Sequence, residues 1–307
     1  IMAGAIVLPS RVSDLRAAAA RTGRTVRVVP SHDDELAPGD GPRGLAALAG
    51  PPLPAPSDGG PGIDTECGLL YTSGTTGRPK GCVLTNAYYL IAGDWYLRIG
   101  GLAAIRPGED RLLTPLPMTH MNAMACSTMA MVLSAGCIVP LDRFHPGSWW
   151  DSVRAARATI VHYLGVMPAM LIGAPPAPDD ANHSVRFGFG AGVDRRHQAP
   201  FEARFGFPLL EAWAMTETGG GAAVIASEAP RHVGTSCFGR AGPALEIRLV
   251  DEAGADVAVD APGELLVRAA GADPRRGFFR EYLKDAAATA EAFAGGWFHT
   301  GDVVRRD

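Results

Sequence analysis

Short apolar runs of strand length alternate with helical segments through the first two thirds of this chain. The strand candidates are residues 6–8, 26–29, 69–72, 138–141, 160–164 and 185–189. Such alternation predicts a mostly parallel sheet with helices packed on it. Ser13 precedes an alanine-rich run at 14–21 that Gly23 follows, and Ser148 stands in capping-box spacing from Asp151. These signals predict two of the helices.

The stretch from 121 to 141 carries no charge and is long enough to suggest a membrane span. Gly136 and Pro140 interrupt it, and its Ala, Ser, Thr, Asn and Cys content is too polar for a bilayer core. We expect a buried helix followed by a short strand at 137–141, and no membrane span.

The pattern changes after about Ala229. Residues 245–249 alternate between apolar and charged side chains, 251–254 resemble a turn, and 264–267 form another strand candidate. This is typical of antiparallel structure. A short helix is expected at 285–293, before two glycines.

The predicted fold is therefore α/β, with mostly parallel sheets layered with helices and a small antiparallel, β-barrel-like subdomain. We expect one part at 1–228 and the β-rich part at 229–307. Residues 38–62 are rich in Pro, Gly and Ala, which favours a long surface connection.

Composition narrows the classes of function. The 307 residues are 47% hydrophobic and 20% charged, with a net charge of −4, so a large core is expected and nucleic acid is a poor partner. The odd number of widely spaced cysteines argues against disulfides and zinc and favours the cytosol. They are Cys67, Cys82, Cys126, Cys137 and Cys237.

The run at 71–81 is rich in hydroxyl side chains and glycines and contains one lysine. Glycine lets backbone N–H groups approach an anion closely, and hydroxyls and an ammonium add further donors, so the run predicts a phosphate-binding loop. It is not a Walker A loop, because Lys80 follows Pro79 and no Ser or Thr follows it. The run reads Tyr71, Thr72, Ser73, Gly74, Thr75, Thr76, Gly77, Arg78, Pro79, Lys80, Gly81.

This run resembles the phosphate loop of the adenylate-forming enzymes, which include acyl-CoA synthetases, firefly-type luciferases and the adenylation domains of peptide synthetases. The resemblance implies that the loop binds the phosphates of ATP, with Lys80 in a catalytic role. The residues that it implicates are Thr72, Ser73, Gly74, Thr75, Thr76, Gly77 and Lys80.

A second motif follows the apolar pair at 209–210, where a strand gives way to a loop. It resembles the family's aromatic-x-Met-Thr-Glu segment, which implies that Trp213 flanks the adenine, Thr216 touches the α-phosphate and Glu217 binds Mg²⁺. We assign Glu211 and Ala212 to the same nucleotide site. Alanine at 212 and 214 stands where glycine is common in relatives, and Trp213 stands where Tyr is frequent.

Three further segments carry candidate residues. The run at 297–302 matches the family's Trp-Phe/Leu-x-Thr-Gly-Asp motif, which implies that Asp302 accepts the ribose hydroxyls. The loop of Gly190, Ala191 and Gly192 is not a dinucleotide fingerprint, because Val193 replaces the third glycine. It resembles the family's loop beside the adenine and acyl pocket. The segment at 115–120 makes His120 a candidate for contacting the carboxylate substrate.

The resemblance as a whole implies an ATP-dependent acid–thiol ligase, which forms an acyl-adenylate from a carboxylic acid and then a thioester with coenzyme A. Segments 142–150 and 277–282 look most like carnitine/crotonobetaine-CoA ligases, although the acid itself is not carried over. The alternatives are an amino-acid adenylation module and a nucleotide-binding domain without turnover. The oligomeric state stays open.

Relatives carry a further segment before the point that matches Ile1 and a smaller domain with a catalytic lysine after the point that matches Asp307. We expect both to be absent here, so that binding of nucleotide persists while thioester formation is lost.

Overall fold

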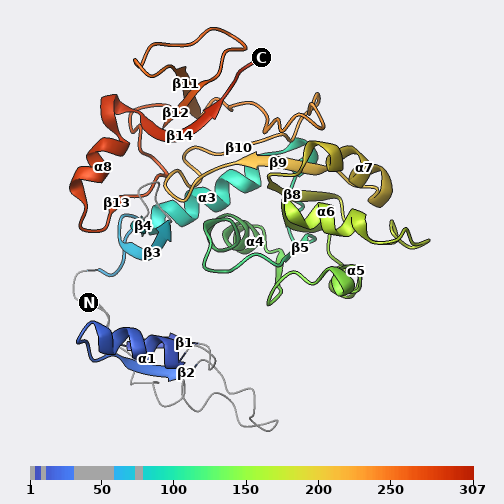
Figure 1. Cartoon of the computed structure of the whole chain (residues 1–307), viewed down its shortest axis with the longest axis horizontal. Helices are drawn as coiled ribbons and strands as arrows, with labels where there is room; N and C mark the ends of the chain where they lie inside the picture. Colours follow the sequence, from blue (N-terminus) through green and yellow to red (C-terminus); the bar gives the residue numbers. More distant parts are fainter. Residues whose placement is uncertain (1–3, 8–11, 31–58, 73–78) are drawn as a thin grey trace. The chain divides into compact units, whose positions relative to one another are not determined.

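Six strands form the main sheet in the computed structural model, which describes residues 4–7, 12–30, 59–72 and 79–307 (Figure 1). Five strands run parallel, and β10 is antiparallel to β9 at one edge. In spatial order they are β10 (Val224–Ile225), β9 (Leu209–Trp213), β8 (Phe187–Ala191), β7 (Ile160–Leu164), β5 (Arg111–Thr114) and β6 (Cys137–Pro140).

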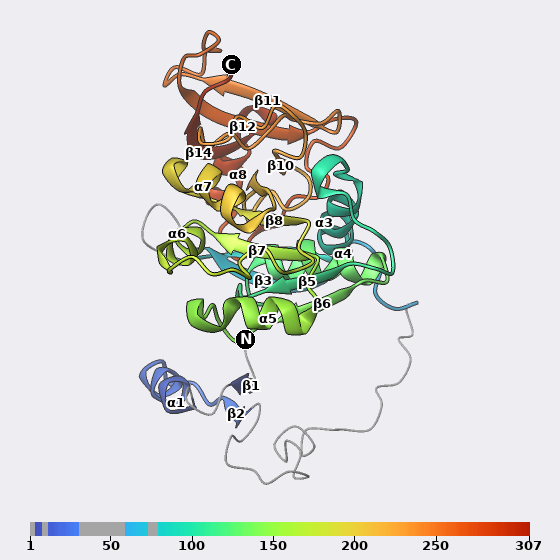
Figure 2. The same ribbon diagram turned by 90° about the vertical axis from the view of Figure 1, so that its right-hand side faces the viewer.

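Helices cover both faces of this sheet (Figure 2). Neighbouring strand residues point to opposite faces, so Leu112 belongs to one buried cluster and Leu113 to the other. The first cluster contains side chains of α3 (Asn86–Arg98), the π-helical η3 (Asn122–Ser127) and α4 (Thr128–Leu133). The second contains side chains of α5 (Trp149–Ala156), α6 (Val166–Gly173) and α7 (Arg195–Phe205).

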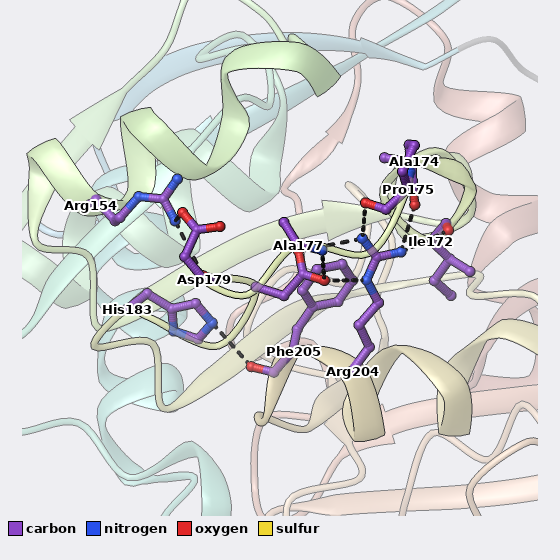
Figure 3. A network of polar contacts seen from close by, with 10 residues as sticks. Arg154, Ile172, Ala174, Pro175, Ala177, Asp179, His183, Arg204 and Phe205 are labelled. Atoms are coloured by element: carbon purple, nitrogen blue, oxygen red, sulfur yellow. Dashed lines mark hydrogen bonds and ion pairs between the residues drawn. The ribbon is translucent and has the colours of Figure 1, made fainter.

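Arg204 joins α6 to α7 through a network of hydrogen bonds that Figure 3 shows. Its guanidinium donates to the carbonyls of Ile172, Ala174 and Pro175 at 2.7–3.0 Å and pairs with Asp180 at 2.7 Å. A cation suits these carbonyls because they are the free acceptors at the end of a helix. The hydrogen bond from Arg204 also lowers the pKa of Asp180.

A second sheet has three antiparallel strands, β3 (Glu66–Thr72), β4 (Lys80–Thr85) and the short β13 (Glu281–Tyr282). The prediction that 69–72 belongs with the parallel strands was therefore wrong. The chain turns back after Thr72 and Lys80 becomes its partner across the ladder, a reversal that the apolar pattern of 69–72 alone does not encode.

A third sheet contains β11 (Leu245–Val250), β12 (Gly263–Ala269) and β14 (Phe298–Val304), all antiparallel, with α8 (Ala286–Ala292) beside them in the sequence. The predicted α/β fold with a small antiparallel subdomain is confirmed. Side chains of β12 and β14 share the buried cluster that also holds Leu112. The division into 1–228 and 229–307 stays a prediction.

Contacts divide the chain into two units, Ile1–Gly60 and Pro61–Asp307. In the first, α1 (Val12–Arg21) connects the parallel strands β1 (Gly4–Val7) and β2 (Arg27–Pro30). Ser13 lies inside α1 instead of before it, which corrects the predicted start; Asp14 supplies the acidic group in the first turn. Most of the connection predicted at 38–62 lies outside the described residues.

The remaining helix predictions had mixed outcomes. Ser148 does precede α5, but its side chain makes no capping hydrogen bond, and Asp151 pairs with Arg154 at 3.1 Å instead. The predicted helix and strand at 121–141 are confirmed as η3, α4 and β6. Among the described helices, none is both long and apolar enough to cross a membrane. Short 3₁₀ turns lie at Gly101–Ala103, Pro146–Ser148 and Ala294–Gly296.

Candidate functional site

The two ends of the predicted phosphate loop are held side by side. Thr72 ends β3, Lys80 begins β4, and the two residues are partners in the antiparallel ladder. The loop between them therefore connects two paired strands. Its residues Ser73, Gly74, Thr75, Thr76 and Gly77 lie outside the described residues.

Glu217 lies at this same place, although it comes from the turn after β9. Its side chain is buried, with 5% of the residue exposed, and its Oε1 accepts hydrogen bonds from the hydroxyls of Thr72 and Tyr282, each at 3.1 Å. Burial and the charge of Glu217 raise the pKa of Tyr282, so this hydroxyl stays a donor at neutral pH. The structure thus brings the phosphate-loop flank and the predicted metal ligand together.

Lys80 approaches the same tyrosine from another side. Its Nζ lies 4.8 Å from the centre of the Tyr282 ring, within the usual cation–π range. Tyr282 was not among the predicted site residues. It belongs to the 277–282 segment that carried the subgroup resemblance, but nothing in that segment indicates a contact with Glu217.

Cys82 is fully buried on β4, where it is the ladder partner of Tyr282. Its burial and the nearby charge of Glu217 raise the pKa of the thiol. A thiol in this state is a weak nucleophile, so Cys82 has no evident part in the chemistry.

The turn that carries Thr216 and Glu217 packs on α3. The Tyr88 hydroxyl donates to the Thr216 carbonyl at 2.8 Å, and Gly219 adopts a positive φ of 52° against the Tyr88 ring. A Cβ at Gly219 would lie 2.4 Å from that ring, so the position requires glycine. Thr216 itself is half-buried and adjoins Glu217.

Glu211 turns away from solvent. Its carboxylate accepts hydrogen bonds from the Tyr163 hydroxyl at 2.6 Å and from the backbone N–H groups of Gly192 and Val193 at 2.9 and 3.2 Å. Burial raises the pKa of Glu211. These contacts fix the loop after β8 that contains Gly190, Ala191 and Gly192. The geometry therefore favours a positioning role for Glu211 over direct contact with a ligand.

A hydrogen bond joins Trp213 on the main sheet to Asp302 on the third sheet. The indole Nε1 at the end of β9 donates a 2.8 Å hydrogen bond to Oδ2 of Asp302 on β14. Asp302 is also held by its own backbone N–H, which donates to the Thr300 hydroxyl at 3.0 Å. The residues predicted for adenine and ribose are thus adjacent. Ala212 is half-buried, and its partner across the edge of the main sheet is Ile225.

His120 is the predicted candidate for contacting the carboxylate substrate. It is exposed, just before η3, and its Nδ1 accepts a long 3.5 Å contact from the backbone of Asn122. Nearby protein atoms partly desolvate the imidazole and lower its pKa. In the described part of the chain, no hydrogen bond joins His120 to Lys80 or Glu217. Its role with the carboxylate substrate stays a prediction.

The donor set fits Mg²⁺ bound together with a nucleotide. Within the described ranges, no three His, Cys, Asp or Glu residues cluster as a metal cage. Mg²⁺ commonly takes one or two carboxylates and completes its shell with phosphate oxygens and water. Glu217, oriented by two hydroxyls beside the phosphate loop, is suited to that arrangement.

This chain is similar to a known protein family and to curated bacterial proteins. The profile of the AMP-binding enzyme family matches residues 6–283. The crotonobetaine/carnitine–CoA ligase of Citrobacter koseri is 31% identical over 249 residues, covering 80% of this chain and 46% of the relative. The protein of the same name from Escherichia coli O157:H7 is 30% identical over 246 residues, again covering 80% and 46%.

Solved structures agree in fold. The ATP-bound MatB of Rhodopseudomonas palustris is 25% identical with a TM-score of 0.77, covering 99% of this chain and 57% of that one. A benzoate CoA ligase from Burkholderia xenovorans is 21% identical with a TM-score of 0.79, covering 98% and 57%.

The chain spans about half the length of the curated relatives that it matches. The family profile nevertheless covers most of its residues, including the three segments that meet at Glu217. The chain therefore belongs to the AMP-binding enzyme family.

Proposed function

We propose that this chain belongs to an ATP-dependent acid–thiol ligase, which activates a carboxylic acid as an acyl-adenylate and, in the complete protein, passes the acyl group to coenzyme A. The observation that supports this best is the convergence of Thr72, Lys80 and Glu217 around Tyr282. A hydroxyl, an ammonium and a buried carboxylate in one place suit a metal-bound triphosphate better than a packing role.

In the first step, a carboxylate oxygen of the acid attacks the α-phosphorus of ATP, and the bond to the β-phosphate breaks to release pyrophosphate. Lys80 and the loop hydroxyls would spread the charge that develops on the phosphates, and Thr216 would contact the α-phosphate. Mg²⁺ held by Glu217 would neutralise part of that charge. Positioning and electrostatics account for the step, without a covalent enzyme intermediate.

The nucleoside would lie between the neighbouring motifs. Trp213 presents an aromatic face for the adenine, and Asp302 keeps Oδ1 outside its bond to Trp213. A carboxylate can accept from both ribose hydroxyls because it has several lone pairs. Glu211 would hold the 190–192 loop in position beside the nucleotide through its hydrogen bond from the Gly192 N–H.

In the second step, the sulfur of coenzyme A attacks the acyl carbon of the adenylate, and AMP leaves. The names of the curated relatives favour coenzyme A over a carrier-protein thiol as the acceptor. They also suggest crotonobetaine and carnitine as acids to test. An amino-acid adenylation module has no comparable support. Location in the cytosol stays a prediction.

The experiment combines calorimetric titration of this chain with Mg-ATP and pyrophosphate exchange by the full-length protein, driven by a panel of carboxylic acids. The sequence has two lysines, Lys80 and the exposed Lys284, so Lys284→Ala is a matched control for Lys80→Ala. Lys80→Ala should weaken binding or slow exchange about tenfold or more, because a charge-assisted contact is worth about 1.5–3 kcal/mol. Lys284→Ala should match the wild type.

Equal values for Lys80→Ala and wild type in both assays would remove the loop from the mechanism. Binding of Mg-ATP without exchange for any acid would instead favour a nucleotide-binding domain without turnover.

A further inference from the structure

We propose that Tyr282 is a positioning residue that orients both charged groups of the site, Glu217 through its hydroxyl and Lys80 through its ring. This inference rests on the proposed function, since it concerns how the same site is kept ready for a metal-bound nucleotide.

The hydroxyl acts on Glu217. Tyr282 and Thr72 both donate to Oε1, so the two hydrogen bonds fix the rotation of the carboxylate and leave Oε2 outside them. Both Tyr282 and Glu217 are almost fully buried, at 7% and 5% exposure, where few waters compete for the bond. A carboxylate that supplies one oxygen to a metal depends on such neighbours for its orientation.

The ring acts on Lys80. The ammonium lies 4.8 Å from the ring centre, on a half-buried side chain at the first position of β4. A long lysine side chain has many rotamers, and a cation–π contact favours those that keep the ammonium over the ring. Lys80 is thereby held near the end of the phosphate loop.

Tyr282 can orient Glu217 and Lys80 because hydrogen bonds fix its own backbone. Its backbone pairs with β4 opposite Cys82, and its N–H donates to the Thr289 hydroxyl at 3.0 Å. On one side, Leu283 donates its N–H to the carbonyl of Gly81 at 2.7 Å; on the other, Phe279 donates to the carbonyl of Glu217 at 2.8 Å. The segment around Tyr282 therefore bonds both to the strand of Lys80 and to the turn of Glu217.

Two substitutions separate the two contacts. Tyr282→Phe removes the hydroxyl and keeps the ring, whereas Tyr282→Leu removes both. Tyr89→Phe is the matched control, because among the described residues the hydrogen bond of the Tyr89 hydroxyl is a long 3.9 Å contact with Met124 Sδ, and not with Glu217. Melting temperatures of all variants are measured first.

The first readout is calorimetric affinity for ATP with Mg²⁺ and for ATP with a chelator. Tyr282→Phe should lower the affinity for Mg-ATP about tenfold while changing that for metal-free ATP much less, since a hydrogen bond to a charged group is lost. Tyr89→Phe should bind both forms as the wild type does.

The second readout needs no nucleotide. Lys80 and Lys284 are modified with an amine-reactive reagent. Mass spectrometry then gives the modification rate of Lys80 divided by that of Lys284. Tyr282→Phe should leave this ratio unchanged, and Tyr282→Leu should raise it severalfold as the ammonium of Lys80 is released from the ring.

Should Tyr282→Phe fold poorly, Thr72→Val removes the other hydroxyl from Oε1 and leaves the ring in place; the affinity for Mg-ATP should fall while the labelling ratio stays that of the wild type. Wild-type binding and labelling by the Tyr282 variants, or wild-type binding by Thr72→Val in that case, would overturn the positioning role and leave the proposed function standing. A wild-type chain that binds no Mg-ATP would overturn the proposed function, and the inference with it.

Discussion

The hydroxyl of Thr72 donates a 3.1 Å hydrogen bond to Glu217, a residue 145 positions away in the sequence. Thr72 ends the strand before the phosphate loop, and Glu217 lies in the turn after β9 of the main sheet. One hydrogen bond thus joins two motifs on two sheets.

Replacing Glu217 by glutamine should separate metal binding from packing. The amide keeps the shape and still accepts from Thr72 and Tyr282, so the fold should be kept, with a modest fall in melting temperature because two buried donors lose a charged acceptor. Pyrophosphate exchange should fall by a large factor, because the charge that would attract Mg²⁺ is lost. A variant that melts early but reacts normally when folded would show that the carboxylate is structural.

Trp213→Phe should weaken nucleotide binding while preserving an aromatic face. The lost bond to Asp302 is largely exposed, so we expect about 1 kcal/mol, or about fivefold in the dissociation constant for AMP. A double-mutant cycle with Asp302→Asn checks this by calorimetry. Strictly additive effects would mean that the indole–carboxylate bond does not support the ribose site.

Glu211→Gln tests whether this residue positions the loop or contacts the ligand. Three donors lose a charged acceptor in a buried place, so the free energy of unfolding should fall by about 1–3 kcal/mol in urea titrations. Nucleotide affinity should fall less. Unchanged stability with more than tenfold weaker binding would restore the direct contact first predicted for Glu211.

His162 predicts a loss of stability in acid. It is fully buried between the hydroxyls of Ser127 and Thr114, at 2.7 and 2.9 Å, and burial lowers its pKa from 6.5 to about 3. The folded protein therefore keeps His162 neutral, while the unfolded chain takes up a proton below pH 6.5. Stability should be unaffected by this group above that pH and should fall as the pH drops toward 3.

At pH 5 the loss from His162 should be about 2 kcal/mol, at about 1.4 kcal/mol for each pH unit below 6.5. His162→Gln can still form hydrogen bonds but cannot titrate in this range, so its stability should depend less on pH. Urea titrations of both proteins from pH 7 to 5 measure the difference. Parallel pH dependences would show that His162 does not titrate as described.

Strands with strong apolar patterns could be predicted well from the sequence. The prediction at 160–164 coincides with β7, because Ile160 and Val161 are apolar and buried on opposite faces of the sheet. The pairing of β3 could not be predicted in the same way. Its direction depends on the reversal between Thr72 and Lys80, which involves a second strand and not the pattern of the first.

The site was predictable in its motifs but not in its contacts. The resemblance of two motifs to one family led us to predict that Lys80 and Glu217 act in one site, whereas Tyr282 contacts Glu217 from 65 positions away and carries no local signal. Glu211 shares its motif with Trp213, yet it lies two residues after Leu209 and faces the same side of the sheet as Tyr163. The family motif does not encode this orientation, which depends on the Tyr163 hydroxyl of strand β7.

Binding of Mg-ATP at the site of Lys80 and Glu217 can be measured by the protection of the two lysines of this chain from chemical modification. The chain is treated with an amine-reactive reagent with and without Mg-ATP, and the modification rates of Lys80 and the exposed Lys284 are measured by mass spectrometry. We expect Mg-ATP to slow modification of Lys80 at least tenfold and to leave Lys284 unchanged. Equal rates at Lys80 with and without saturating Mg-ATP would show that the nucleotide does not bind at Lys80.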